Sequence, residues 1–192
     1  MRIGILGSGL MGGKLGTLFA RAGHGVVFSY ARSEEKLERR APCRRHWSRV
    51  GDVLAQAGDL AGKALLTCSL PMNDDDTALV IANTSSGAEE LAAKIPAARV
   101  VAAFNTVPSE VLFDVYAGRR KASRPSLVYC GDDRRAKTTA ARLIRDAGFE
   151  PLDAGPLRIA RYTEPFGLLV AQLAYEGKGG PRLAYTFQKF KS

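Results

Sequence analysis

Residues 2–13 read Arg-Ile-Gly-Ile-Leu-Gly-Ser-Gly-Leu-Met-Gly-Gly, and this stretch decides the fold. The apolar residues within 2–6 predict a short buried strand. Gly7, Gly9 and Gly12 follow that strand in the spacing G-x-G-x-x-G. The first glycine allows a tight turn, the second lets a pyrophosphate approach the backbone, and the third permits close packing of helix on strand. The stretch therefore predicts a dinucleotide-binding turn.

A helix is predicted directly after this turn. Leu15, Leu18 and Phe19 recur at helical spacing, and Gly23 ends the pattern. The N-terminus of such a helix offers N–H groups and a partial positive charge to phosphates. A glycine-rich turn that binds nothing is the alternative. The residues expected to contact the cofactor here are Gly7, Ser8, Gly9, Leu10, Met11 and Gly12.

Lys14 raises the question of a phosphate-binding P-loop, which the spacing excludes. A P-loop requires a glycine six positions before its lysine, where this chain has Ser8. It also requires a Ser or Thr directly after the lysine, where this chain has Leu15.

The next predicted strand indicates which dinucleotide binds. A strand over residues 26–28 leads towards Arg32, and the acid that accepts from the ribose 2′-OH in NAD sites is absent at its end. Arg32, with the hydroxyls of Ser29 and Ser33, can instead donate charge-assisted hydrogen bonds to a 2′-phosphate. We therefore expect NADP. A solvated arginine before a helix start is the alternative.

Length and composition favour a single soluble domain, or a domain with a small appendage. The chain has 192 residues, of which 46% are hydrophobic and 24% charged. Its apolar runs are shorter than the ~20 residues that cross a bilayer, so we expect no membrane partner. Cys43, Cys68 and Cys130 lack C-x-x-C spacing, which argues against zinc sites and disulfides and favours the reducing cytoplasm.

The net charge of +9 suits a polyanionic cofactor as well as a nucleic acid. Aromatic residues do not alternate with the basic ones, as platforms for single-stranded nucleic acids require. We therefore expect no nucleic-acid partner. Arg39, Arg40, Arg44, Arg45 and Arg49 supply much of the excess charge.

Strands and helices are predicted to alternate along the remaining chain, which favours an α/β, Rossmann-type doubly wound parallel sheet. Residues 1–150 are expected to form the NADP-binding domain and residues 151–192 a C-terminal extension with an apolar helix, which makes a homodimer the expected assembly. The predicted strands are 63–69, 99–104, 126–131 and 149–153; the predicted helices are 33–40, 52–57, 85–94, 109–116, 132–147 and a stretch around 168–174.

Several motifs together resemble the NADPH:coenzyme F420 oxidoreductases, also called F420-dependent NADP reductases. They are Gly7-Ser-Gly-Leu-Met-Gly, Arg32, Phe104-Asn-Thr-Val-Pro, Cys130-Gly-Asp-Asp, Pro151-Leu-Asp-Ala-Gly-Pro-Leu and Glu176-Gly-Lys-Gly-Gly. The cytoplasmic domains of ferric metalloreductases share this module. The resemblance implies hydride transfer between NADP(H) and a deazaflavin, with both cofactors in one cleft.

The resemblance also implies further site residues. Asn105 and Thr106 follow a predicted strand and would line the cleft between the two rings, although they could instead cap the next helix. Gly155, Pro156 and Leu157 would contact the second cofactor, or simply form a turn that starts a helix. Trp47 stands at the position of a tryptophan in the family and is expected at the cofactor.

No side chain is expected to act as a catalytic acid or base, because hydride transfer between two cofactors depends on proximity and orientation. Asp132 and Asp133 stand at a predicted helix start, where acids complement the helix dipole, so we expect no metal site. Cys68, Ser69 and His46 form no recognisable nucleophile–base pair, which argues against a hydrolase.

The chain departs from the family between Arg32 and His46. Family members carry two further strands and their helices there, whereas this chain has only the 13 residues 33–45. A doubly wound fold would need roughly 30 more residues for those elements. We therefore expect the sheet to lack a strand beside the first one, leaving Ile3, Ile5 and Val101 with fewer neighbours.

Three functions fit these observations. The first is an oxidoreductase that transfers a hydride between NADP(H) and coenzyme F420. The second uses the same NADP site with a flavin or a metal as acceptor. The third is a non-enzymatic or vestigial protein that binds a dinucleotide after losing the cleft with the missing strands.

Overall fold

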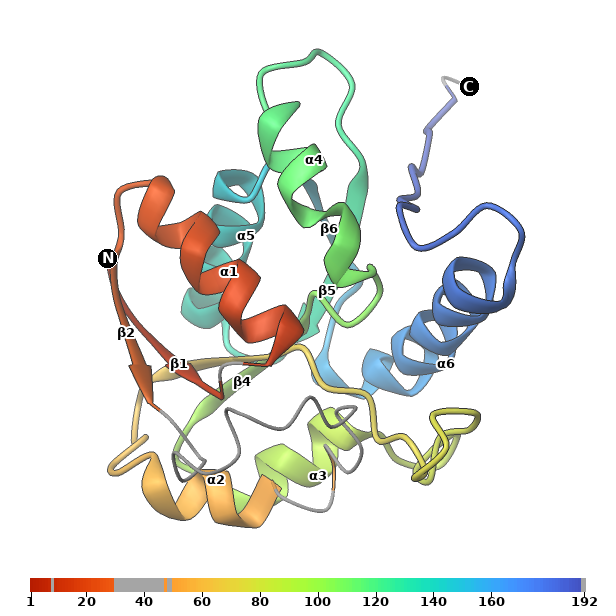
Figure 1. Cartoon of the computed structure of the whole chain (residues 1–192). Helices are drawn as coiled ribbons and strands as arrows, with labels where there is room; N and C mark the ends of the chain where they lie inside the picture. Colours follow the sequence, from red (N-terminus) through yellow and green to blue (C-terminus); the bar gives the residue numbers. More distant parts are fainter. Residues whose placement is uncertain (8, 30–46, 48–49, 191–192) are drawn as a thin grey trace, which may run out of the picture.

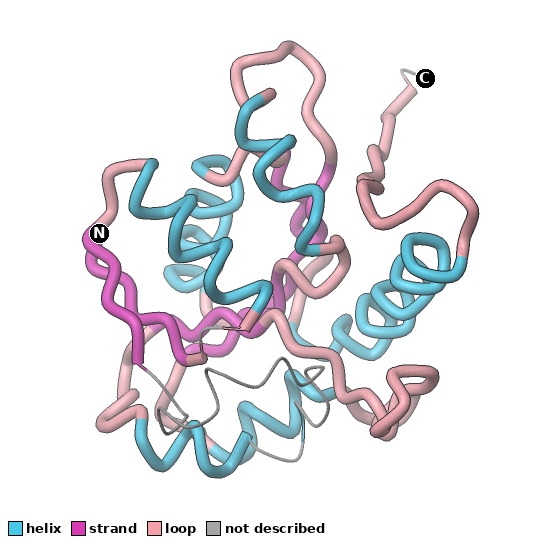
Figure 2. Tube along the Cα trace, viewed as in Figure 1, coloured by secondary structure: helices cyan, strands magenta, loops and turns pink. Residues whose placement is uncertain are grey.

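The computed structural model describes residues 1–7, 9–29, 47 and 50–190, which form an α/β fold with helices on both sides of the strands (Figures 1 and 2). The strands are β1 (Arg2–Leu6), β2 (Gly25–Ser29), β3 (Ala64–Thr67), β4 (Arg99–Ala103), β5 (Ser126–Gly131) and β6 (Glu150–Asp153). The helices are α1 (Leu10–Arg21), α2 (Val50–Gln56), α3 (Gly87–Lys94), η3 (Ser109–Val111), α4 (Leu112–Ala117), α5 (Arg134–Asp146), η4 (Leu157–Ile159), α6 (Ala160–Ala171) and the π-helical turn η5 (Gln172–Glu176).

The predicted strands and helices are confirmed wherever the structure describes the chain. The helix expected at 33–40 lies outside the described residues. Capping explains two of the helix starts. Ser86 accepts a hydrogen bond from the Glu89 N–H to begin α3, and Asp133 accepts one from the Ala136 N–H to begin α5.

The described strands form two separate sheets. β1 pairs only with β2, in parallel, and the other four strands follow the order β3-β4-β5-β6. In a doubly wound sheet the first strand would have a neighbour on each side. The shortened region lies outside the described residues, so the missing strand beside β1 stays a prediction.

One pairing differs from the all-parallel sheet that the alternation predicts: β5 runs antiparallel to β4, with Ala103 opposite Tyr129. The connection between them contains η3 and α4, followed by a loop over residues 118–125. Through this loop the chain enters β5 from the edge at which β4 ended. The 13-residue α5 is long enough to cross back, and β6 accordingly runs parallel to β5.

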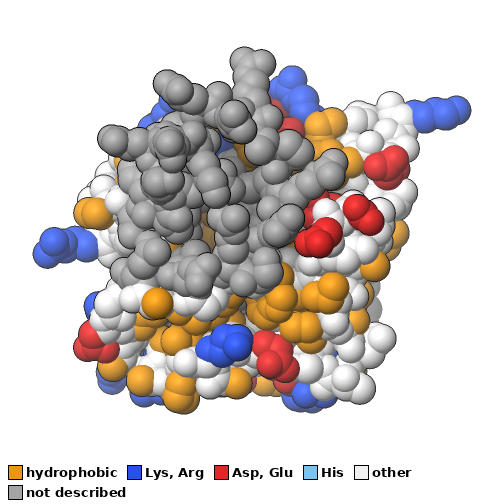
Figure 3. All heavy atoms as spheres, turned by 60° about the horizontal axis from the view of Figure 1, so that its bottom comes forward, with side chains coloured by type: hydrophobic (Ala, Val, Ile, Leu, Met, Phe, Trp, Pro, Cys, Tyr) orange, Lys and Arg blue, Asp and Glu red, His pale blue; other side chains and the backbone are white. Residues whose placement is uncertain are grey.

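Two apolar layers cover the four-stranded sheet. On one face, α1, α4 and α5 pack over alternate residues of β4, among them Val101 and Ala103. On the other face, α3 and η4 pack over Val100 and Ala102, with part of α2 alongside. Figure 3 views this second side, where apolar side chains lie among scattered charged ones.

The expectation of lost neighbours is wrong for Val101 and stays a prediction for β1. Val101 is fully buried, because β4 has a neighbour on each side and a helix layer above it. Ile3 and Ile5 remain partly buried, since β1 has a single neighbour among the described strands.

The C-terminal extension packs against the main body of the fold. β6, which begins at residue 150, pairs with β5. The segment after α6 also reaches β5, because the Ser126 N–H donates to the carbonyl of Tyr185 at 2.8 Å. The aromatic rings of Phe166, Tyr185 and Phe187 contact one another beside it. Tyr185 thereby fixes the extension at the edge where β4 ends.

Candidate dinucleotide and acceptor site

The glycine turn between β1 and α1 has the geometry that its spacing predicts. Gly7 has φ of +88°, which a residue with a side chain rarely adopts. A Cβ on Gly12 would lie 2.3 Å from the carbonyl oxygen of Gly7, so no side chain fits between helix and turn. The predicted structural roles of the first and third glycines are therefore confirmed.

The start of α1 is suited to an anion. Gly9 occupies the N-cap position and provides no side-chain cap, and the first turn contains no acidic residue. The first N–H groups of a helix have no partner within the helix and attract phosphate. Leu10 is 65% exposed and Met11 half-buried, so the first turn of α1 borders solvent. These features fit the pyrophosphate of a dinucleotide.

Three residues of the predicted cofactor site lie outside the described residues: Ser8, Arg32 and Ser33. Ser29 ends β2 as predicted, opposite Leu6 of β1. The contact of Arg32 with a 2′-phosphate therefore remains a prediction.

The loop after β4 turns sharply and presents Asn105. Phe104 adopts φ of +66°, which is unusual for a residue with a side chain. Its ring is buried between Phe19 and Phe149 in edge-to-face contacts, and this packing holds the unusual backbone in place. The chain thus leaves β4 at the edge where Asn105 and Thr106 follow.

Asn105 is 6% exposed, and neither its amide nitrogen nor its carbonyl oxygen has a hydrogen-bond partner among the described residues. Thr106, in contrast, shares a 2.7 Å hydrogen bond with the Tyr185 hydroxyl. Neither side chain caps the next helix, since η3 begins after Pro108 without a side-chain cap. Buried amides normally have partners, so Asn105 has capacity for a ligand.

Helix α6 packs directly on this loop. A Cβ on Gly167 would lie 2.5 Å from the Asn105 carbonyl oxygen and 3.2 Å from the side chain of Leu70. The loop after β3 therefore meets the loop after β4 at this point. Gly167 was not among the predicted residues of the site, although a glycine within an apolar helix is a signal of such close packing.

Gly155, Pro156 and Leu157 lie at the carboxyl end of β6. Gly155 has φ of +108° and accepts a hydrogen bond from the Gly131 N–H. Because β5 and β6 run opposite to β4, this loop is at the other edge of the four-stranded sheet from Asn105. The described contacts do not bring the two predicted halves of the cleft together. Pro156 is the N-cap of η4. This position agrees with the alternative interpretation of residues 155–157, in which they form a turn that starts a helix.

The two aspartates beside that loop accept hydrogen bonds from backbone N–H groups. Asp132 accepts a hydrogen bond from the Leu157 N–H at 2.8 Å, and Asp133 caps α5. Within the described ranges, His, Cys, Asp and Glu form no group of three or more that could hold a metal ion. Burial raises the pKa of the Cys68 thiol to about 11 and that of Cys130 to about 12, so both thiols stay protonated near neutral pH.

Trp47 lies against the start of α3 on the second face. A Cβ on Gly87 would lie 3.0 Å from its ring. Glu164 of α6 reaches the same helix start and accepts hydrogen bonds from the N–H groups of Gly87 and Ala88 at 2.8 and 2.9 Å. Burial raises the pKa of this carboxyl to about 7, although the two hydrogen bonds oppose the shift. This contact joins residues 77 positions apart and was not predictable from local sequence patterns.

A hollow of about 610 Å³ lies away from the glycine turn. Its lining residues come from the amino ends of β3, β4 and α5, and they include Ala64, Arg99 and Arg134. The carboxyl ends of β3 and β4 lie at the opposite edge, and open α/β sheets bind ligands at the carboxyl ends of their parallel strands. We therefore do not assign this hollow to the dinucleotide.

Comparison with known proteins supports the Rossmann-type fold. The structure superposes with a TM-score of 0.83 on a protein of Arthrobacter sp. assigned as an F420-dependent NADP reductase, at 22% identity over 97% of this chain and 98% of that one. It superposes with a TM-score of 0.63 on the hypothetical protein SMa0349 of Sinorhizobium meliloti, at 21% identity over 96% and 95% of the two chains. The resemblance predicted from the motifs and the predicted fold class are thereby confirmed.

A sequence relative is metalloreductase STEAP3 of Rattus norvegicus, 32% identical over 188 residues. The match covers 87% of this chain but only 36% of the relative, so the chain spans about a third of that protein.

No family model matches the chain. Among the described helices, none combines the length and the apolar composition needed to cross a membrane. The Arthrobacter protein and STEAP3 are both named as reductases, which agrees with the prediction of an oxidoreductase.

Proposed function

We propose that the chain binds NADP(H) at the turn between β1 and α1 and transfers a hydride between it and coenzyme F420. The observation that carries the proposal is the glycine turn itself. Gly7 has a left-handed backbone, Gly12 leaves no room for a side chain, and α1 begins without a side-chain cap. When bound, the nicotinamide supplies the hydride chemistry, and the protein supplies binding and orientation.

NADP is favoured over NAD because no acid ends β2 and Arg32 follows it. Losing one charge-assisted hydrogen bond to the 2′-phosphate should cost about 1.5–3 kcal/mol, roughly ten- to a hundredfold in affinity. Titration of the wild type and of Arg32→Ala with NADPH and NADH tests this. We expect only the NADPH affinity to fall in the variant. Equal affinities of the wild type for the two cofactors would contradict the proposal.

F420 is the proposed acceptor because the motifs resemble the F420-dependent reductases and the Arthrobacter protein of the same fold carries that assignment. Asn105, with its two unpartnered amide atoms, is the residue we expect to contact the ring at the end of β4. Mixing the protein with NADPH and F420 and following the absorbance of both cofactors tests the acceptor. A metal or a flavin is the alternative acceptor, supported by the metalloreductase relative.

A second candidate function is dinucleotide binding without turnover. The separation of β1–β2 from the other sheet favours it, because the cleft is normally completed by a strand beside β1. NADPH binding together with an absence of turnover on F420, flavin and ferric acceptors would support this candidate over the enzyme.

We also propose a homodimer formed through α6 and the turn after it. Tyr162, Leu169, Leu173 and Tyr175 are each more than half exposed there and present an apolar surface. Light scattering of the wild type and of Leu169→Lys tests the assembly, and we expect the variant to be monomeric. A reducing compartment such as the cytoplasm suits Cys68 and Cys130, both of which are free thiols.

A further inference from the structure

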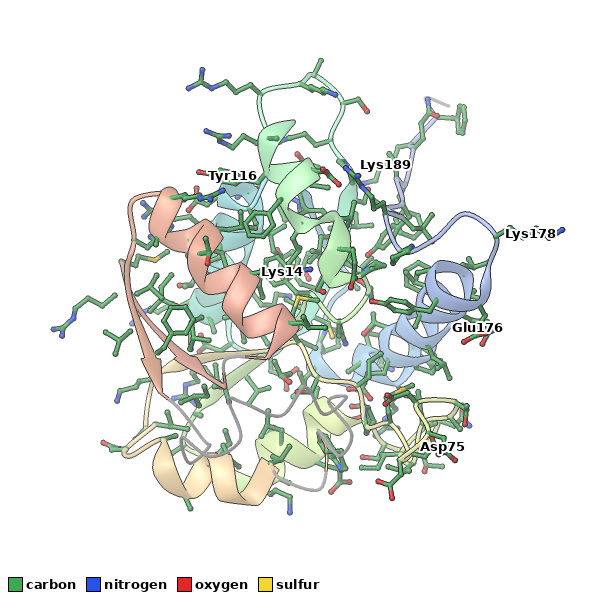
Figure 4. All side chains as sticks on the ribbon, in the orientation of Figure 1. Lys14, Asp75, Tyr116, Glu176, Lys178 and Lys189 are labelled. Atoms are coloured by element: carbon green, nitrogen blue, oxygen red, sulfur yellow. The ribbon has the colours of Figure 1, made fainter. Side chains whose placement is uncertain are left out.

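Lys14 connects the dinucleotide-binding helix with the loop after β4. It is the fifth residue of α1, and its side chain is half-buried. The Lys14 Nζ donates a hydrogen bond to Ser109 Oγ at 3.1 Å, and Ser109 is the buried first residue of η3. Figure 4 shows the labelled side chain directed from α1 towards the interior of the molecule.

The positive charge of Lys14 lacks an acidic partner in the described part of the chain. The seven ion pairs found there do not include it, although Lys137 of α5, for comparison, pairs with Asp153 at 2.9 Å. A half-buried ammonium group with one neutral hydroxyl as its partner is poorly compensated. If Lys14 only tied α1 to η3, a neutral side chain would do so without this cost.

The neighbouring loop also has unused hydrogen-bonding capacity. Asn105 lies four residues before Ser109, and both polar atoms of its buried amide have no partner among the described residues. The hydroxyl of Thr106, which lies between them in the sequence, already forms a hydrogen bond with the Tyr185 hydroxyl. An uncompensated cation on α1 and an unpartnered amide in the loop after β4 therefore lie on two segments that the Lys14–Ser109 hydrogen bond joins.

We propose that Lys14 is a specificity-determining residue of the acceptor site, which selects a planar redox cofactor whose ring becomes an anion on reduction. This inference rests on the proposed function. In hydride transfer the C4–H bond of the reduced nicotinamide breaks, and its hydrogen leaves with both electrons to form one new bond on the acceptor ring. The nicotinamide becomes cationic and the acceptor gains one negative charge, which the Lys14 ammonium compensates.

The test compares oxidised and reduced acceptors as ligands, using F420 and FMN in parallel arms. Their dissociation constants are measured by fluorescence under anaerobic conditions for the wild type, Lys14→Met, Lys14→Arg and Ser109→Ala. Lys14→Met should weaken binding of the reduced rings by about ten- to a hundredfold, and that of the oxidised rings by less than about threefold. Lys14→Arg and Ser109→Ala should stay near the wild type, and NADPH affinity should be unchanged.

Equal losses for both redox forms in Lys14→Met, or the same losses in Ser109→Ala, would overturn the inference, because Lys14 would then only hold α1 against η3. That result leaves the proposed function standing if the wild type still reduces F420. In another outcome the wild type does not reduce F420, but Lys14→Met binds reduced FMN much more weakly than the wild type does. This outcome supports the inference and contradicts the F420 assignment. NADPH binding without binding of either ring would overturn both.

Discussion

The two-stranded sheet and the four-stranded sheet of this chain differ in how completely they are covered. Every residue of β5 is buried, whereas Val27 and Phe28 of β2 are 64% and 37% exposed. The four-stranded sheet has helices on both faces, and β1 has a single strand neighbour among the described residues. The dinucleotide turn thus lies on the less covered two-stranded half, while Asn105, which we expect to contact the acceptor ring, follows β4 of the well-packed half.

The largest expected effect comes from restoring the missing strands. Insertion of a related reductase's strand–helix–strand segment after Leu37, which lies outside the described residues, should stabilise the protein and raise F420 turnover. Each apolar side chain that becomes fully buried contributes about 1.5–3 kcal/mol, against a total stability of about 5–15 kcal/mol for a domain. Thermal unfolding and hydrogen exchange of β1 and β2 measure the change.

A Gly/Ser linker of the same length, inserted at the same position, is the control for this experiment. It should leave both stability and turnover low, since it adds no strand to bury β1. A wild type that is monomeric, thermally robust and fully active with F420 would show that the shortened segment does not destabilise the two-stranded sheet of β1 and β2.

Gly12→Ala is expected to have the next largest effect. The added Cβ would lie 2.3 Å from the Gly7 carbonyl, so α1 must move away from the turn, at a cost of about 3 kcal/mol or more and with loss of NADPH binding. Gly4→Ala is the matched control, because nothing lies within 4 Å of its added Cβ and alanine is preferred to glycine in a strand by roughly 0.5–1 kcal/mol. Chemical denaturation and NADPH titration should separate the two variants, and similar behaviour would contradict this account of the turn.

Gly9→Val separates binding from folding on the same turn. We expect loss of dinucleotide binding with an unchanged circular dichroism spectrum, because a branched side chain would occupy the approach of the pyrophosphate. If the fold is lost together with binding, Gly9 has a structural role instead.

In the four-stranded half, Glu164 should make stability depend on pH. Its pKa is raised from 4.5 to about 7 in the folded state, so its contribution is fully present below about pH 4.5 and is lost as the pH rises towards 7. The change amounts to at most about 3 kcal/mol. Glu164→Gln should abolish this slope in denaturation curves measured between pH 4.5 and 7.

Glu89 provides the control of opposite sign. Its hydrogen bonds with Arg161 lower its pKa, so its contribution is present at neutral pH and is lost as the pH falls below the ordinary range of a glutamate. Glu89→Gln should therefore keep most of the slope between pH 4.5 and 7, with a small reduction because the Glu89 charge contributes to the raised pKa of Glu164. A slope that persists in Glu164→Gln would assign the titration to another group.

The smallest expected effect comes from removing the Tyr185 hydroxyl, which holds the C-terminal extension against the loop after β4 and against β5. Tyr185→Phe removes the 2.7 Å hydrogen bond with Thr106 and leaves the Val128 N–H without its 3.1 Å partner. The expected cost is about 1–2 kcal/mol in urea denaturation. Tyr162→Phe, at a 65% exposed position, should change stability by less than about 0.5 kcal/mol, and equal effects would argue against this role of Tyr185.

Most of the helices and strands were predictable because each depends on neighbouring residues. Ser86 and Asp133 cap the helices that follow them. Gly7 specifies the turn through its left-handed backbone, and Gly12 through the absence of a Cβ. The direction of β5 was not predictable in this way, because it depends on the path of the whole segment between β4 and β5 and on the packing of that segment. The prediction for Val101 failed for a related reason: its burial depends on strands far away in the sequence.

The sequence by itself determined the strand–turn–helix unit that suits a dinucleotide, since glycine conformations and helix starts are local properties of the chain. Only the tertiary structure decided what faces that unit. It separated Asn105 from Gly155 by reversing β5, and it placed the Lys14 ammonium against Ser109. It also left the Asn105 amide buried without a partner. These outcomes depend on packing between distant segments, where burial and hydrogen-bond satisfaction decide which polar groups remain for a ligand.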